Sequence, residues 1–147
     1  MNKELIRSLI QSNQELMNLV PDTVALAQAL TQQNPVMQET WLTDRGFVAE
    51  VVARNGGSTT MSDSILDKFD LASTQSRSVK SVVNRLYTDP MGLNFGDSFL
   101  RGWFSSMTPT LFTEAERDVL LSLASPKEVS EFEVRCAIFN DDGSLAV

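Results

Sequence analysis

Apolar residues recur at three- and four-residue spacing in short runs, and proline, glycine or asparagine interrupts each run. This spacing places the apolar side chains on one face of an α-helix, whereas a half-buried strand would alternate apolar and polar residues. Proline and glycine end helices because proline lacks a backbone donor and glycine tolerates a left-handed cap. The pattern predicts an all-α fold, a compact bundle of about six to eight short helices.

The chain has 147 residues, of which 42% are hydrophobic and 21% charged. These values are typical of one folded domain, so a single globular domain over residues 1–147 with one hydrophobic core is predicted. The longest apolar stretches are far shorter than the roughly twenty residues of a bilayer span. The first residues also lack the apolar core and cleavage site of a secretory signal.

Cys136 is the only cysteine, which excludes an intrachain disulfide and agrees with a reducing compartment. We therefore expect a cytoplasmic protein, in the host cytoplasm if the source is viral, without membrane contact. Because Cys136 lies in an apolar stretch, it is predicted to be a buried and unreactive thiol.

The first predicted helix covers residues 2–20, with Asn2 as its N-cap and Pro21 as its stop. Five of its residues step by three and four and form one seam with an asparagine in the middle. A buried asparagine can fix the register of a coiled coil, so this seam is a candidate for self-association. Alternatively, its leucines pack on the chain's own core and the asparagine lies at the edge. The seam consists of Ile6, Leu9, Asn13, Leu16 and Val20.

The same periodicity predicts further helices, and the last segment is ambiguous. Residues 47–52 could form a strand, although helix is favoured. The aromatic run 99–107 is expected to fill the centre of the core. From residue 129 onward, a helical face and a strand alternation are both present, and the turn 140–143 could close a small C-terminal β-hairpin. Helices are expected after Val24, after Asn34–Pro35 and over 47–52, 62–70, 73–87, 99–107, 114–123 and 126–139.

Nineteen acidic and twelve basic residues give a net charge of -7, which opposes binding to nucleic acid. Much of the excess lies in residues 114–147, where eight acids face three bases. A possible acidic partner-binding face is predicted there, made of Glu128, Glu131, Glu133, Asp141 and Asp142.

One predicted helix is modestly basic, because Arg77, Lys80 and Arg85 fall within it. These cations could contact an acidic partner or the acidic C-terminus of another copy, or they could simply be solvated.

The sequence contains no histidine, which excludes Ser-His-Asp and Cys-His catalysis and removes the commonest metal ligand. Asp63, Asp67 and Asp70 share one helix face, but their spacing is not that of a calcium loop. A solvated helix face is the better interpretation. No catalytic residue, cofactor site or metal site is predicted, and we expect that the protein is not an enzyme.

The segment 111–129, LFTEAERDVLLSLASPKEV, resembles the first helix and turn of the helix-turn-helix domains of response regulators. The resemblance implies a DNA-binding regulator whose next segment is the recognition helix. In that segment three glutamates outnumber Lys127 and Arg135, which disfavours DNA.

These observations favour a non-enzymatic protein–protein interaction or assembly protein that self-associates as a homo-oligomer. Its size and acidity would suit an accessory protein of a phage or mobile element. The alternatives are a helix-turn-helix-like DNA-binding regulator, or an acidic inhibitor that presents carboxylates to a nucleic-acid-binding host protein.

Overall fold

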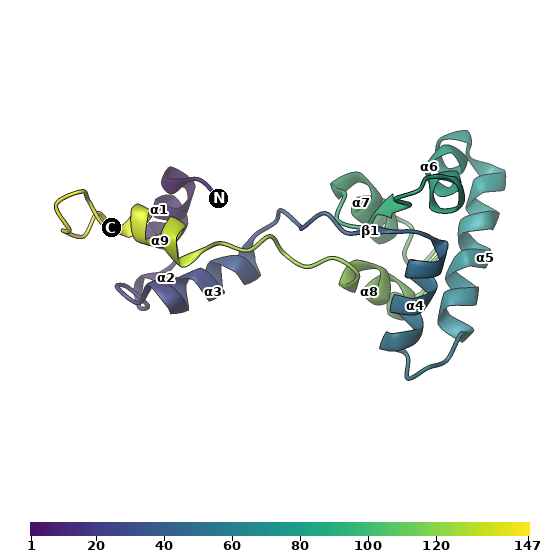
Figure 1. Ribbon diagram of the computed structural model, residues 1–147, viewed down its shortest axis with the longest axis horizontal. Coiled ribbons are helices and arrows are strands. Elements are labelled where there is room, and N and C mark those ends of the chain that lie inside the picture. Colours follow the sequence, from purple (N-terminus) through teal and green to yellow (C-terminus); the bar gives the residue numbers. More distant parts are fainter. The chain divides into compact units, whose positions relative to one another are not determined.

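The computed structural model describes residues 1–147, and the chain is mainly α-helical (Figure 1). The all-α prediction is confirmed, with nine helices in place of six to eight. None of the helices combines the length and the apolar character needed to cross a bilayer. The elements are α1 (Lys3–Ser12), α2 (Gln14–Met17), α3 (Thr23–Gln33), β1 (Trp41–Leu42), α4 (Asp44–Arg54), α5 (Thr60–Gln75), α6 (Arg77–Thr88), β2 (Leu93–Asn94), α7 (Ser98–Ser106), α8 (Glu114–Ser122) and α9 (Glu131–Ile138).

The chain divides into two compact units, each with its own hydrophobic core. Unit 1 comprises residues 1–36 and 126–147, and unit 2 comprises residues 37–125. The expectation of one core is therefore wrong. The single domain over 1–147 stays a prediction, since two units with separate cores can still unfold as one cooperative domain.

Unit 1 contains α1, α2, α3 and α9, packed around a core of aliphatic side chains. The predicted continuous helix 2–20 is wrong, because the chain breaks at Asn13. The Asn13 side chain accepts hydrogen bonds from the backbone N–H groups of Glu15 and Leu16 and so caps α2. An asparagine that bonds to nearby backbone competes with the helix in this way. The fully buried members of this core include Ile6, Ile10, Leu26, Leu30, Val134 and Ile138.

The helix predicted to start at Asn34–Pro35 does not form, since the residues after α3 are extended. The buried Asn34 side chain instead donates to the carbonyl of Lys127 and accepts from the N–H of Val36, so it ties two chain segments of unit 1 together. Satisfying the polar groups of this extended stretch replaces the helical bonds.

The C-terminal segment combines both structures that its sequence allowed. Its helix begins at Glu131, later than the predicted residue 126, and its capping box is formed by Ser130 and Glu133. The helix prediction is confirmed over α9. After it, the turn closes with Gly143 at φ 82° and a single antiparallel bridge joins Phe139 to Leu145, so the predicted hairpin is reduced to one bridge.

Unit 2 contains α4 to α8 and the antiparallel pair β1–β2, in which Trp41 lies opposite Asn94 and Leu42 opposite Leu93. The helix predicted over 47–52 is confirmed within α4. The core is aromatic, with ring centroids of neighbouring phenylalanines about 6 Å apart. Its fully buried rings are Phe47, Phe69, Phe95, Phe104 and Phe112.

Candidate functional site

Phe99 is the most exposed large apolar side chain of unit 2, at 72% of its surface. The expectation that the aromatic run fills the core is therefore correct for Phe104 and wrong for Phe99. Asp97 caps α7 by accepting a hydrogen bond from the N–H of Leu100. Leu100 and Phe104 are four residues apart and point into the core, whereas Phe99 is turned about 100° away from Leu100.

Two adjoining hollows lie beside Phe99, between α6 and α7. The first is small, about 40 Å³, and all its lining residues except Ser78 are apolar. The second, about 340 Å³, extends from Phe99 to Trp41 and Arg85. Because both are lined by Val82, Phe99 and Leu100, they form one continuous surface, which we call the α6–α7 groove.

The sequence of α6 explains one wall of this groove. Val83 and Leu86 are buried, while Val79 and Val82 are half-buried at the edge of the same apolar face. The apolar face of α6 is wider than the area that the neighbouring helix covers, so residues at the edge of this face stay partly exposed. Trp103 on α7 closes the small hollow from the other side.

The end of the groove is set by the strand pair. Gly92 has φ +81°, and a Cβ atom at this position would lie 1.9 Å from the carbonyl oxygen of Leu42. Only glycine fits here, because any side chain would collide with the backbone of β1. The close approach of the two segments leaves Trp41 exposed where it lines the larger hollow.

Helix α6, on one side of the groove, carries a net positive charge. Arg77, Lys80 and Arg85 are exposed, α6 contains no acidic residue, and none of the three cations forms an ion pair. Arg77, Ser81 and Arg85 follow one another at four-residue steps, which places them along one side of the helix. Arg85 lines the larger hollow directly.

Lys80 is about 60° around α6 from Arg77 and about 140° from Arg85, and it lies on the side of Tyr87, seven residues further on. Burial, followed by the carboxylates of Asp70, Asp44 and Asp67, raises the pKa of the Tyr87 phenol. That side of α6 is therefore near acidic groups. The charged residues that line the groove itself are Arg85 and Asp97. Among the three predicted cations, Arg85 lines the groove, and neither Arg77 nor Lys80 lines either of its two hollows.

A second polar cluster of unit 2 surrounds Glu116, which is buried. Its carboxylate accepts hydrogen bonds of 2.8 Å from the Ser64 hydroxyl and from the N–H of Thr113, and it pairs with Lys68. Burial disfavours the charged carboxylate, but the bonds from Lys68, Thr113 and Ser64 outweigh burial and hold the pKa of Glu116 below its ordinary value. Because every polar atom is engaged, this cluster stabilises α8 against α5.

Thr113 and Glu116 also form the capping box at the start of α8. The pairing with Ser64 and Lys68 was missed, because the two helices are far apart in sequence. Asp63, Asp67 and Asp70 are exposed on α5, which agrees with a solvated helix face.

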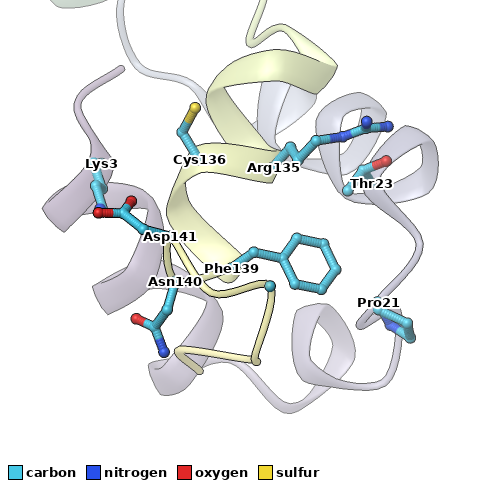
Figure 2. A pocket seen from close by; sticks show the side chains of 9 residues that line it. Lys3, Pro21, Thr23, Arg135, Cys136, Phe139, Asn140 and Asp141 are labelled. Atoms are coloured by element: carbon cyan, nitrogen blue, oxygen red, sulfur yellow. The ribbon is translucent and has the colours of Figure 1, made fainter.

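A hollow of about 730 Å³ in unit 1 is lined by charged, polar and apolar residues together (Figure 2). Cys136 lies at this hollow and is exposed, so the prediction of a buried thiol is wrong. The reason is the orientation of α9, which buries Val134, Ala137 and Ile138 and turns Phe132 and Cys136 outward.

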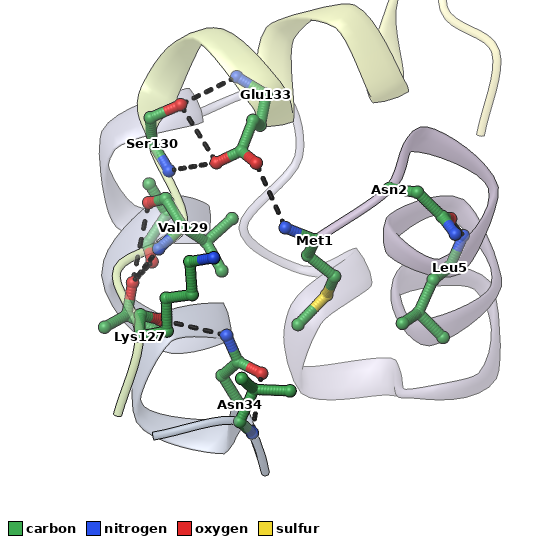
Figure 3. Close-up of polar contacts among 11 residues, drawn as sticks. Met1, Asn2, Leu5, Asn34, Lys127, Val129, Ser130 and Glu133 are labelled. Carbon is green, nitrogen blue, oxygen red and sulfur yellow. Dashed lines mark hydrogen bonds and ion pairs between the residues drawn. The ribbon is translucent and has the colours of Figure 1, made fainter. Parts of the chain in front are cut away.

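Three members of the predicted acidic face are engaged within unit 1. Glu131 accepts hydrogen bonds from Thr23 and Arg135, and Asp142 accepts from the N–H and hydroxyl of Ser144. The pKa of Glu133 is lowered, first by the Ser130 N–H and then by the Met1 ammonium group 3.0 Å away (Figure 3). Glu128 and Asp141 are exposed.

The predicted self-association seam is not one exposed stripe. Ile6 and Leu16 are buried in the core of unit 1, Leu9 and Val20 pack against that core, and Asn13 is the helix cap described above. The alternative, in which Leu5, Leu9 and Leu16 pack on the chain's own core, is correct for Leu9 and Leu16 and wrong for Leu5, which is exposed. Self-association itself stays a prediction.

The helices that resemble a helix-turn-helix do not form that motif. Helix α8 belongs to unit 2 and α9 to unit 1, and residues 123–130 separate them. A helix-turn-helix requires a turn of about three or four residues. DNA binding therefore stays a prediction without this motif to support it.

Comparison of the chain with protein-family models, with curated proteins and with solved structures gives no match.

Proposed function

We propose that this chain is a non-enzymatic protein-interaction protein that binds a partner protein in the α6–α7 groove. The observation that carries the proposal is the exposure of Phe99 beside an apolar hollow. An aromatic ring in water gains about 1.5–3 kcal/mol on burial, and nothing within unit 2 covers this one. A partner surface would supply that burial.

The composition of the groove supports a protein partner. Trp41, Trp103 and Arg85 are of the residue types that dominate interface hot spots, and Phe99 is aromatic as well. The smaller hollow, about 40 Å³, is lined by apolar residues and Ser78. It has the size for the end of one side chain.

Affinity capture with matched variants tests this function. A tagged wild-type protein is compared with Phe99→Ser and with the control Phe132→Ser, since Phe132 is 75% exposed on α9 in unit 1. We expect wild type and Phe132→Ser to retain the same partner and Phe99→Ser to lose it. Retention by Phe99→Ser with loss by Phe132→Ser would assign binding to unit 1 and contradict the proposal.

A further inference from the structure

We propose that the partner in the α6–α7 groove is a second copy of this chain, an inference that rests on the proposed function. The two copies meet groove to groove about a two-fold axis. In such an isologous contact both copies supply the same patch, so each contact between two different residues occurs twice. The groove must therefore be complementary to itself in charge and in shape.

The charged residues that line the groove have opposite signs. Arg85 and Asp97 line the same hollow, yet neither forms an ion pair within the chain. Asp97 accepts from the Leu100 N–H through Oδ2 at 3.0 Å, which leaves Oδ1 for a further donor. A purely acidic partner would meet Asp97, and a purely basic partner would meet Arg85. A second copy presents one carboxylate and one guanidinium group, so two Arg85–Asp97 pairs can form between the copies.

The apolar part of the groove contains both a protruding ring and a hollow. Phe99 is 72% exposed, and the hollow of about 40 Å³ beside it is lined by apolar side chains that include Val79 and Trp103. Because ring and hollow adjoin, a two-fold axis at the groove can place each Phe99 against the small hollow of the other copy. Both rings then leave water in one contact, which the hydrophobic effect favours.

The net charge of the chain opposes association but does not act at the groove. Each copy carries a charge of -7, and this repulsion between whole molecules is screened by salt beyond about 8–10 Å. The lining of the groove contributes one positive and one negative charge. The contact itself therefore brings no excess charge together.

Sedimentation velocity of the full chain tests the inference. We expect a reversible dimer at high micromolar concentration. Phe99→Ser should be monomeric there, whereas the control Phe132→Ser, which removes an exposed ring of unit 1, should dimerise like the wild type. A wild type that stays monomeric at this concentration would overturn the inference.

Charge reversal tests the two ion pairs. Arg85→Glu brings like charges together at both contacts, and so does Asp97→Lys, so each variant alone should dimerise about tenfold or more weakly. An equimolar mixture of the two variants should dimerise again, because each contact then joins opposite charges. Arg77→Glu makes the same change of net charge on α6 outside both hollows, and it should leave the affinity within about twofold.

A conservative pair of variants guards against a folding defect, since Asp97 also caps α7. Asp97→Asn retains an oxygen that can cap the helix, and Arg85→Gln removes only the positive charge. If the two side chains pair between copies, the double variant should dimerise about as weakly as either single variant, because each single change already breaks both pairs. Additive losses would overturn the pairing.

The outcomes separate the inference from the function it deepens. A monomeric wild type that still captures another protein through Phe99 would preserve the proposed function and overturn the second copy as partner. A dimer that persists in Phe99→Ser would place self-association on another surface and also overturn the inference. Retention of a captured partner by Phe99→Ser, with loss by Phe132→Ser, remains the result that contradicts the proposed function.

Discussion

Phe99 on α7 and Arg85 on α6 line the same hollow of unit 2. An exposed aromatic ring and a guanidinium group that forms no ion pair thus line one hollow between two helices that pack on an aromatic core. Burying both groups against another protein would combine apolar contact with a charge-assisted hydrogen bond, the pairing that interface hot spots use.

Phe99 should contribute little to stability, in contrast to its neighbour in the fold, Phe104. Because Phe104 is fully buried, Phe104→Ala should lower the free energy of unfolding by about 3–5 kcal/mol. Phe99→Ala should change it by less than about 0.5 kcal/mol, since its ring is already in water. Urea denaturation followed by circular dichroism measures both. A large loss in Phe99→Ala would mean that its ring is a core residue and not a binding residue.

Glu116→Ala should lower the free energy of unfolding by about 2–4 kcal/mol. The change removes the capping box of α8 and leaves Lys68 without its partner. Glu114→Ala is the control, because Glu114 lies in the same first turn but is exposed, and it should cost no more than about 0.5–1 kcal/mol. Equal losses in the two variants would show that the buried cluster has no special role.

The pH dependence of stability should also report on Glu116. Its pKa in the folded protein lies below the value of about 4.3 for an unfolded chain. The stability that this carboxylate contributes is therefore fully present above about pH 4.3 and is lost as the pH falls through the folded pKa. Denaturation of wild type and Glu116→Gln should show their difference shrinking between pH 6 and about pH 3. If the difference in the free energy of unfolding between the two proteins grew toward low pH, the pKa of Glu116 would be raised in the folded protein and not lowered.

Cys136 should react with a maleimide in the native protein. Its exposure predicts labelling at a rate close to that of the denatured chain, and Cys136→Ser should leave stability within about 0.5 kcal/mol. If labelling required denaturant, Cys136 would be a buried residue and its exposure would be contradicted.

Local signals in the sequence predicted much of the fold. The capping residues Asn2, Asp97 and Thr113 act within three residues of their own positions, and the helices they start are present. The errors arose where asparagine side chains bond to backbone groups and so compete with helix formation, an effect that the spacing of apolar residues does not describe. Asn13 caps a new helix, so the first helix ends earlier than expected. Asn34 bonds to a segment far away in the sequence, and the helix expected to start there does not form.

The candidate site was only partly visible in the sequence. The cations of α6 and the aromatic run were recognised, but their meeting depends on how α7 is rotated about its axis. Helix α7 is rotated so that Leu100 and Phe104 are buried and Phe99 is exposed. The sequence alone does not show this, because apolar and aromatic residues occur on more than one side of the predicted helix. The break into two cores likewise depends on which segments pack together.

Tryptophan emission gives the most direct test of the groove, because the only two tryptophans of the chain, Trp41 and Trp103, both line it. The partner protein obtained by affinity capture is titrated into the wild type, Phe99→Ser and Phe132→Ser, each produced with 7-azatryptophan so that its emission is separate from that of the partner. A saturable blue shift in the wild type and in Phe132→Ser, absent from Phe99→Ser, is the result that the groove predicts. Saturable binding by anisotropy with unchanged tryptophan emission would place the contact elsewhere and contradict the account.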